Sequence, residues 1–247
     1  MDKNDLLNEF IYLGGNHETE EVEDLYDKLC EYTLKVGDDP QIEGVICILR
    51  LWRNEFTFAG ADKNIYYIGS YSSATPTVKR LIDEPEWDLH DINIAAHIVD
   101  YVSAFNQALE LADKVLLKLE DYADSEFTRS IKLVLHTNMT LRLLRAKFTE
   151  VSTACERVRL KEMFMFHHEA AFKICSSDKE RFTIPTLGLA LRLSIFKTGN
   201  RLSCCGTTET LELLKTLKNE ISEYEFLVRR DAELYSRKRE SYKIRVE

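Results

Sequence analysis

Residues that break helices are scarce in this chain of 247 residues, which has only four Pro and nine Gly. Long stretches therefore run without a turn signal, which excludes a fold of short strands joined by tight turns and favours a helical one. The sequence also lacks any run of about 18 apolar residues, so it predicts no membrane span. It predicts an all-α protein that is long enough to bury a sizeable core.

Motifs of catalysis, metal binding and redox chemistry are absent as well. The six Cys form no C-x-x-C pair, and this spacing is typical of reduced thiols in a cytoplasmic protein. The sequence contains no Walker A, G-x-G-x-x-G or G-x-S-x-G motif. His167 and His168 are adjacent, so on a helix they point about 100° apart and do not form a metal pair. The net charge of −9 argues against nucleic-acid binding. We therefore expect no enzyme, no metal or cofactor, no nucleic-acid or membrane partner, and a cytoplasmic location.

Hydrophobic spacing predicts about nine helices in one domain over residues 1–240, followed by a flexible basic and polar tail at 241–247. Residues 59–90 carry loop signals and predict an irregular, insertion-like segment. A connection of this length is either functional or partly helical. Helices joined by short loops pack as antiparallel neighbours, and an arc of them leaves a concave groove suited to extended peptides. The predicted helices lie near 2–13, 18–36, from 40 onward, 91–122, 125–150, 154–176, 185–198, 207–220 and 221–240.

Two pairs of arginines are candidates for phosphate binding. Arg50 and Arg53 are three residues apart on one predicted helix, and Arg142 and Arg145 have the same spacing on another, so each pair shares a helix face. A guanidinium group binds phosphate through its planar fork. The alternative, in which these arginines are solvated and paired with nearby carboxylates, stays open. His136 stands alone on an apolar helix, which indicates a core or groove-lining residue rather than a general base.

The stretch from Thr183 to Phe196 resembles the signature helix of the 14-3-3 family. It reads T-I-P-T-L-G-L-A-L-R-L-S-I-F, where the family has T-x-P followed by L-G-L-A-L-N-F-S-V-F. The chain's first residues, its length and its acidic balance are similar to that family too. The resemblance implies a TPR-related helical bundle that acts as a homo- or heterodimeric, non-enzymatic signalling adaptor. In such an adaptor a concave groove binds phosphoserine or phosphothreonine segments of partner proteins.

The resemblance also implies a set of groove residues. Arg50 stands where a Lys of the third helix is expected to grip the phosphate, and Arg53 or Lys63 replaces a later Arg of that helix. Arg142 matches an Arg of the fifth helix, whereas a shifted alignment brings His136 into the groove instead. The other implied groove positions are Leu191, Arg192, Ile195, Val228, Ala232 and Ser236.

Several of these positions depart from the family pattern. Arg192 and Ala232 replace two Asn that hold the peptide backbone, and Ser236 replaces a Trp of the apolar wall. The resemblance therefore implies an altered groove with atypical specificity. The alternative is a helical scaffold of the same fold that has lost phosphopeptide recognition and binds partners through other surfaces.

The tail contains one candidate modification site. Arg237-Lys238-Arg239-Glu240-Ser241 resembles a target of basophilic kinases, which makes Ser241 a candidate phosphosite. The alternative is a solvated tail that is not modified.

Overall fold

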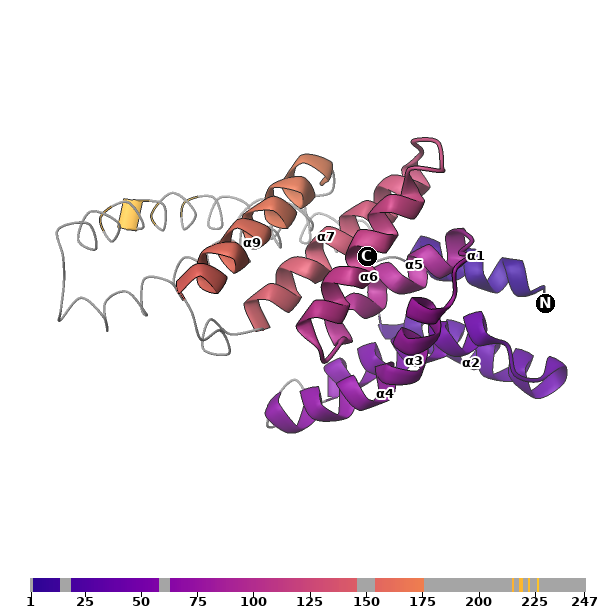
Figure 1. Ribbon diagram of the computed structural model, residues 1–247. Helices are drawn as coiled ribbons and strands as arrows, with labels where there is room; N and C mark the ends of the chain where they lie inside the picture. The colour runs from indigo at the N-terminus through magenta and orange to yellow at the C-terminus, as the bar shows by residue number, and fades with distance from the viewer. Residues whose placement is uncertain are drawn as a thin grey trace, which may run out of the picture. The chain divides into compact units, whose positions relative to one another are not determined.

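The structure is a computed structural model of the chain, and it describes residues 2–13, 19–57, 63–145 and 154–175 and the single positions 215, 218, 219, 222 and 226. These residues contain eight α-helices and one 3-10 helix (Figure 1). The predicted all-α class is confirmed. The chain divides into two compact units, Met1–Ser152 and Thr153–Glu247. The single domain expected over residues 1–240 stays a prediction.

The first unit contains the helices α1 to α7 and the 3-10 helix η1. Their bounds are α1 Lys3–Leu13, α2 Thr19–Val36, α3 Pro40–Thr57, α4 Lys63–Asp83, α5 Leu89–Ile98, η1 Val99–Tyr101, α6 Phe105–Leu119 and α7 Glu126–Arg145.

The boundary between α2 and α3 lies where local signals predict it. Gly37 follows the last residue of α2 with a φ of 100°, a left-handed conformation that glycine adopts without steric cost, and its N–H donates to Thr33 O at 2.9 Å. Asp39 then caps α3, because its Oδ1 accepts from the backbone N–H groups of Gln41 (3.0 Å) and Ile42 (3.2 Å). Pro40 occupies the first helical position, where a missing N–H costs nothing.

The prediction of an irregular segment at 59–90 is wrong over most of its length, because α4 occupies Lys63–Asp83. The alternative, that part of it is helical, is confirmed. The Gly, Ser and Pro signals are outweighed by a buried stripe at Ala74, Val78 and Leu81, which has helical spacing.

Pro76 lies inside α4 and removes one backbone donor from the helix. Two side chains supply donors to carbonyls in the turn before it. Thr75 Oγ1 donates to Tyr71 O at 2.9 Å, and Cys47 Sγ of α3 donates to Ser73 O at 3.4 Å. These bonds go to the carbonyls on either side of that of residue 72, the acceptor that an N–H at position 76 would have used.

The single helix predicted at 91–122 is divided in the structure. α5 ends at Ile98, η1 follows, and Val102 and Ala104 have extended backbone with ψ of 120° before α6 begins. No Gly or Pro marks this break in the sequence. The helix that carries Arg142, counted as the fifth from the sequence, is therefore the seventh α-helix of the described chain.

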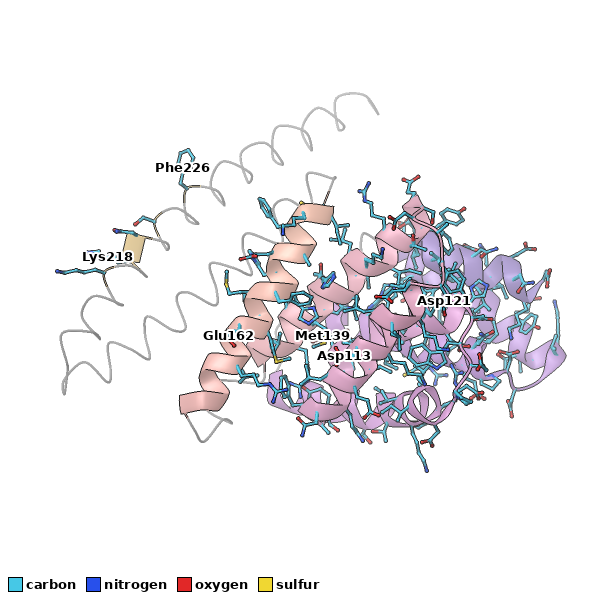
Figure 2. All side chains as sticks on the ribbon, turned by 45° about the horizontal axis from the view of Figure 1, so that its top comes forward. Asp113, Asp121, Met139, Glu162, Lys218 and Phe226 are labelled. Carbon is cyan, nitrogen blue, oxygen red and sulfur yellow. The ribbon has the colours of Figure 1, made fainter. Side chains whose placement is uncertain are left out.

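Packing in the first unit is centred on α5, which contacts α1, α3, α4, α6 and α7. All residues of α5 from Asp91 to Ile98 are buried. The sequence predicts an arc of successive neighbours, whereas this unit surrounds one apolar helix with others. Met139 of α7 belongs to the buried core, whereas Asp121, in the turn before α7, is exposed (both are labelled in Figure 2).

The described part of the second unit is mainly α9, Ala154–Ile174, which agrees with the helix predicted at 154–176. Leu160, Phe164 and Ala171 form its buried side, and the rings of Phe164 and His168 stack with centroids 5.7 Å apart. Among the described helices of the whole chain, none combines the length and apolarity needed to cross a membrane.

Candidate functional site

Arg50 and Arg53 share one face of α3, as their spacing predicts, and both reach Tyr26 of α2. Arg50 Nε donates to the Tyr26 hydroxyl at 3.0 Å, and the Arg53 guanidinium lies 4.3 Å from the centre of the Tyr26 ring. Arg53 also forms an ion pair with Glu23, with Nε 2.7 Å from Oε1. The sequence allowed two interpretations of these arginines, phosphate ligands or partners of nearby carboxylates, and the ion pair with Glu23 shows the second for Arg53. Arg50 is exposed.

Arg142 has a different environment, because it is buried with only 3% of its surface exposed. Its Nε donates to Val102 O and its Nη2 to Ser103 O, each at 2.9 Å. The guanidinium also lies against two rings, 5.9 Å from the centre of Tyr71 and 5.8 Å from that of Phe105. A phosphate ligand needs donors that are open to solvent, so the described geometry does not fit Arg142 in that role.

The described contacts do not bring the two arginine groups into one phosphate cradle. Arg50 and Arg53 contact α2, whereas Arg142 contacts the η1–α6 connection. The side chains of Lys63 and Arg145 lie outside the described residues, and so do the remaining sequence-predicted site positions. These are Leu191, Arg192, Ile195, Val228, Ala232, Ser236 and Ser241.

His136 lies on α7 and is buried, with 5% of its surface exposed. Burial, with a smaller contribution from the positive charge of Lys132, lowers the pKa of its imidazole from 6.5 to about 4. Of the two interpretations offered by the sequence, core and groove, the burial favours the core.

The buried imidazole of His136 predicts a loss of stability in mild acid. Above pH 6.5 the imidazole is neutral in both the folded and the unfolded protein. Below pH 6.5 the unfolded protein binds a proton, whereas the folded protein does not bind one until about pH 4. The stabilisation is therefore complete above pH 6.5 and is lost as the pH falls toward 4. At pH 5 we expect a contribution of up to about 2 kcal/mol to be gone. Urea unfolding of the protein and of His136→Gln at pH 7.5 and 5.0 measures it. Equal pH dependence in both proteins would contradict it.

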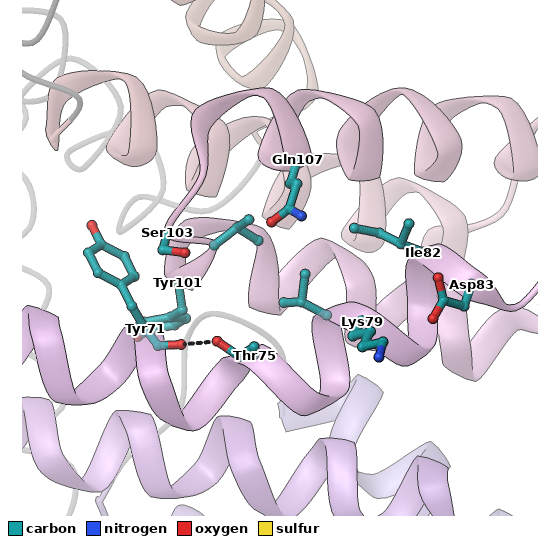
Figure 3. A pocket seen from close by; sticks show the side chains of 10 residues that line it. Tyr71, Thr75, Lys79, Ile82, Asp83, Tyr101, Ser103 and Gln107 are labelled. Atoms are coloured by element: carbon teal, nitrogen blue, oxygen red, sulfur yellow. Dashed lines mark hydrogen bonds between the residues drawn. The ribbon is translucent and has the colours of Figure 1, made fainter.

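An open groove lies between α4 and the segment from η1 to the start of α6 (Figure 3). Its volume is about 330 Å³. We call it the α4–α6 groove, and its lining residues are Tyr71, Thr75, Val78, Lys79, Ile82, Asp83, Tyr101, Val102, Ser103 and Gln107.

The chemistry of the α4–α6 groove changes along its length. Tyr71 and Ser103 lie at one end, and the charged Lys79 and Asp83 lie toward the other (Figure 3). Aliphatic side chains line the space between them, and the amide of Gln107 points from α6 toward α4 (Figure 3). This arrangement offers an apolar surface with hydrogen-bonding groups at its rim. Neither His nor Cys lines it, so the lining contains no nucleophile–base pair of the Ser–His or Cys–His type.

No family model, curated protein or solved structure matches this chain. Its function must therefore be argued from its own residues.

The sequence interpretation missed the α4–α6 groove, because one wall lies in the segment expected to be irregular and the other begins at an unpredicted helix break. One signal was present in the sequence. Tyr71, Thr75, Val78 and Ile82 follow each other at helical spacing, which places them on one face of a helix. That stripe combines aromatic, hydroxyl and aliphatic groups, whereas the neighbouring stripe at 74, 78 and 81 is apolar.

Proposed function

We propose that this protein is a helical protein-binding scaffold that holds a short extended segment of a partner protein in the α4–α6 groove. The observation that supports the proposal is the groove itself, which is open, about 330 Å³ in volume, apolar in the middle and polar at its rim. Sites with an apolar surface and a few orienting polar groups are typical of ligand recognition.

The dimensions of the α4–α6 groove fit a peptide. Between Tyr71 and Asp83, α4 rises about 18 Å at 1.5 Å per residue, and five residues of extended chain span about 17 Å. Val78, Ile82 and Val102 can contact an aliphatic side chain of such a segment. Gln107 carries both a donor and an acceptor, so its amide can pair with a peptide group of the ligand.

A panel of fluorescent, unphosphorylated heptapeptides with a central aliphatic residue tests this proposal. We expect some members to bind at micromolar concentration in fluorescence polarisation. Gln107→Trp, which fills the groove, should reduce that affinity by at least about tenfold, since tenfold corresponds to the loss of one or two good contacts. Asn106→Ala changes an exposed neighbour on α6 that does not line the groove and serves as the matched control. Failure to bind any peptide, or binding that Gln107→Trp leaves unchanged, would refute the proposal.

A second candidate function is the atypical phosphopeptide adaptor that the 14-3-3 resemblance implies, together with its dimeric state and cytoplasmic location. One observation favours it. Arg50 is exposed beside Arg53, and its Nε bond to Tyr26 uses one of the five N–H donors of a guanidinium group.

Paired phosphorylated and unphosphorylated versions of the same peptides separate the two candidates. The adaptor predicts tighter binding of the phosphorylated member and loss of that preference in Arg50→Gln. The scaffold predicts no phosphate preference and sensitivity to Gln107→Trp alone. Both versions are compared at low and moderate salt, because the phosphate contribution is screened by ions.

A further inference from the structure

Arg142 joins three separate parts of the α4–α6 groove although it does not line the groove itself. Its two hydrogen bonds reach the carbonyl oxygens of Val102 and Ser103, both of which are lining residues. Its guanidinium group also lies 5.9 Å from the ring centre of Tyr71, the lining residue at the start of the α4 wall, and 5.8 Å from that of Phe105 at the start of α6. One buried side chain of α7 thus contacts the α4 wall, the η1–α6 connection and the first turn of α6.

These contacts fall where regular structure supplies no backbone partner. Val102 and Ala104 are extended, so the carbonyls of Val102 and Ser103 belong to neither η1 nor α6. Val102 is buried, and a buried carbonyl without a donor is unfavourable; for both carbonyls a charged donor forms a stronger hydrogen bond than a neutral one. Arg142 therefore stabilises the break that gives this wall of the groove its shape.

We infer that Arg142 is the positioning residue of the α4–α6 groove, fixing Tyr71 and the Val102–Ser103 connection in the geometry that receives the partner segment. The inference rests on the proposed function for its ligand. It assigns Arg142 a role different from the exposed phosphate ligand that the sequence suggests. Lysine does not reproduce this role, because an ammonium group lacks the planar fork that donates to two adjacent carbonyls.

Hydrogen–deuterium exchange of the free protein tests the inference without any ligand. In Arg142→Gln and Arg142→Lys we expect the amides of Val102 and Ala108, which donate to Val99 O and Ala104 O, and those of residues 71–75 to exchange about ten times faster or more, since the lost bonds are charge-assisted. Amides of α2 and α3 should exchange as in the unchanged protein. Arg129→Gln removes an exposed arginine from the same helix and serves as the matched control. Equal acceleration in all helices would mean general destabilisation and would overturn the inference.

Peptide binding supplies the second readout. The peptide selected with the unchanged protein should bind Arg142→Gln at least about tenfold more weakly, while Arg129→Gln keeps its affinity. Millimolar methylguanidinium should restore affinity to Arg142→Ala, whereas methylammonium should not, because only the former reproduces the fork. Unchanged affinity in Arg142→Gln would overturn the inference about Arg142 but not the proposed function. If the unchanged protein binds no peptide, the proposed function fails, and the exchange pattern still decides whether Arg142 orders this wall.

Discussion

Replacing Arg80 with methionine should lower the free energy of unfolding by about 2–4 kcal/mol, because it leaves a buried carboxylate without its cation. Arg80 Nη1 lies 2.9 Å from Asp91 Oδ1, and Asp91 is 6% exposed in the first turn of the central helix α5. Gln41 Nε2 donates to the other oxygen of that carboxylate at 3.0 Å and would remain. Methionine keeps the apolar stem of Arg80, so the change tests the charge more than the packing.

Denaturant unfolding of a double-mutant cycle measures this effect. Arg80→Met combined with Asp91→Asn should recover most of the loss, because the neutral amide no longer needs a cation and can still bond Gln41. The exposed pair Glu31–Lys35, spaced i,i+4 on α2, is the matched control, and Lys35→Met should cost less than about 0.5 kcal/mol. If Arg80→Met cost no more than Lys35→Met, the ion pair would not stabilise the junction of α3, α4 and α5.

The elements that the sequence predicts well are those whose limits depend on neighbouring residues. Gly37 ends α2 through its own backbone freedom, and Asp39 and Pro40 begin α3 through bonds within one turn. The α9 helix likewise lies where its apolar spacing predicts it. These signals act over four residues or fewer, so a single sequence contains them.

The elements that the sequence predicts poorly depend on contacts between distant residues. The break at Val102 coincides with a hydrogen bond from Arg142, forty positions along the chain, and no residue near the break indicates it. The α4 helix continues through Pro76, and its residues Ala74 and Leu81 are buried against other helices of the unit. Periodicity alone contains neither fact.

The same distinction explains the candidate site. Spacing correctly predicts that Arg50 and Arg53 share a helix face, but it does not say that this face meets Tyr26 and Glu23. For Arg142, the spacing predicts which face of the helix it shares with Arg145. It does not predict that Arg142 is buried. The α4–α6 groove is formed where α4 and α6 each pack on α5, so it could be predicted only after the helix at 63–83 and the break before 105 were known.

Replacing Gly44 with leucine should lower the free energy of unfolding by about 3 kcal/mol or more, or prevent folding, because α3 approaches α5 and α4 closely at this residue. A Cβ atom on Gly44 would lie 3.1 Å from Ile94 Cγ2 and 3.4 Å from Thr77 Cγ2. The three further carbons of leucine would enter space that Ile94, itself 1% exposed in α5, already fills. Glycine has a low helix propensity, but its lack of a side chain at this position allows α3 to pack closely against the central helix α5.

Two further variants make the Gly44 prediction specific to packing. Gly44→Ala should gain about 1 kcal/mol from helix propensity, but its Cβ atom would lie a few tenths of an ångström too close to Ile94. These effects oppose each other, so we expect the free energy of unfolding to change by less than about 1 kcal/mol. Glu43→Leu introduces the same leucine one position earlier, on an exposed site, and should change stability by less than about 0.5 kcal/mol. Urea unfolding of all three decides the matter. A Gly44→Leu protein as stable as Glu43→Leu would mean that α3 and α5 do not meet at Gly44, and the packing around α5 would need a different description.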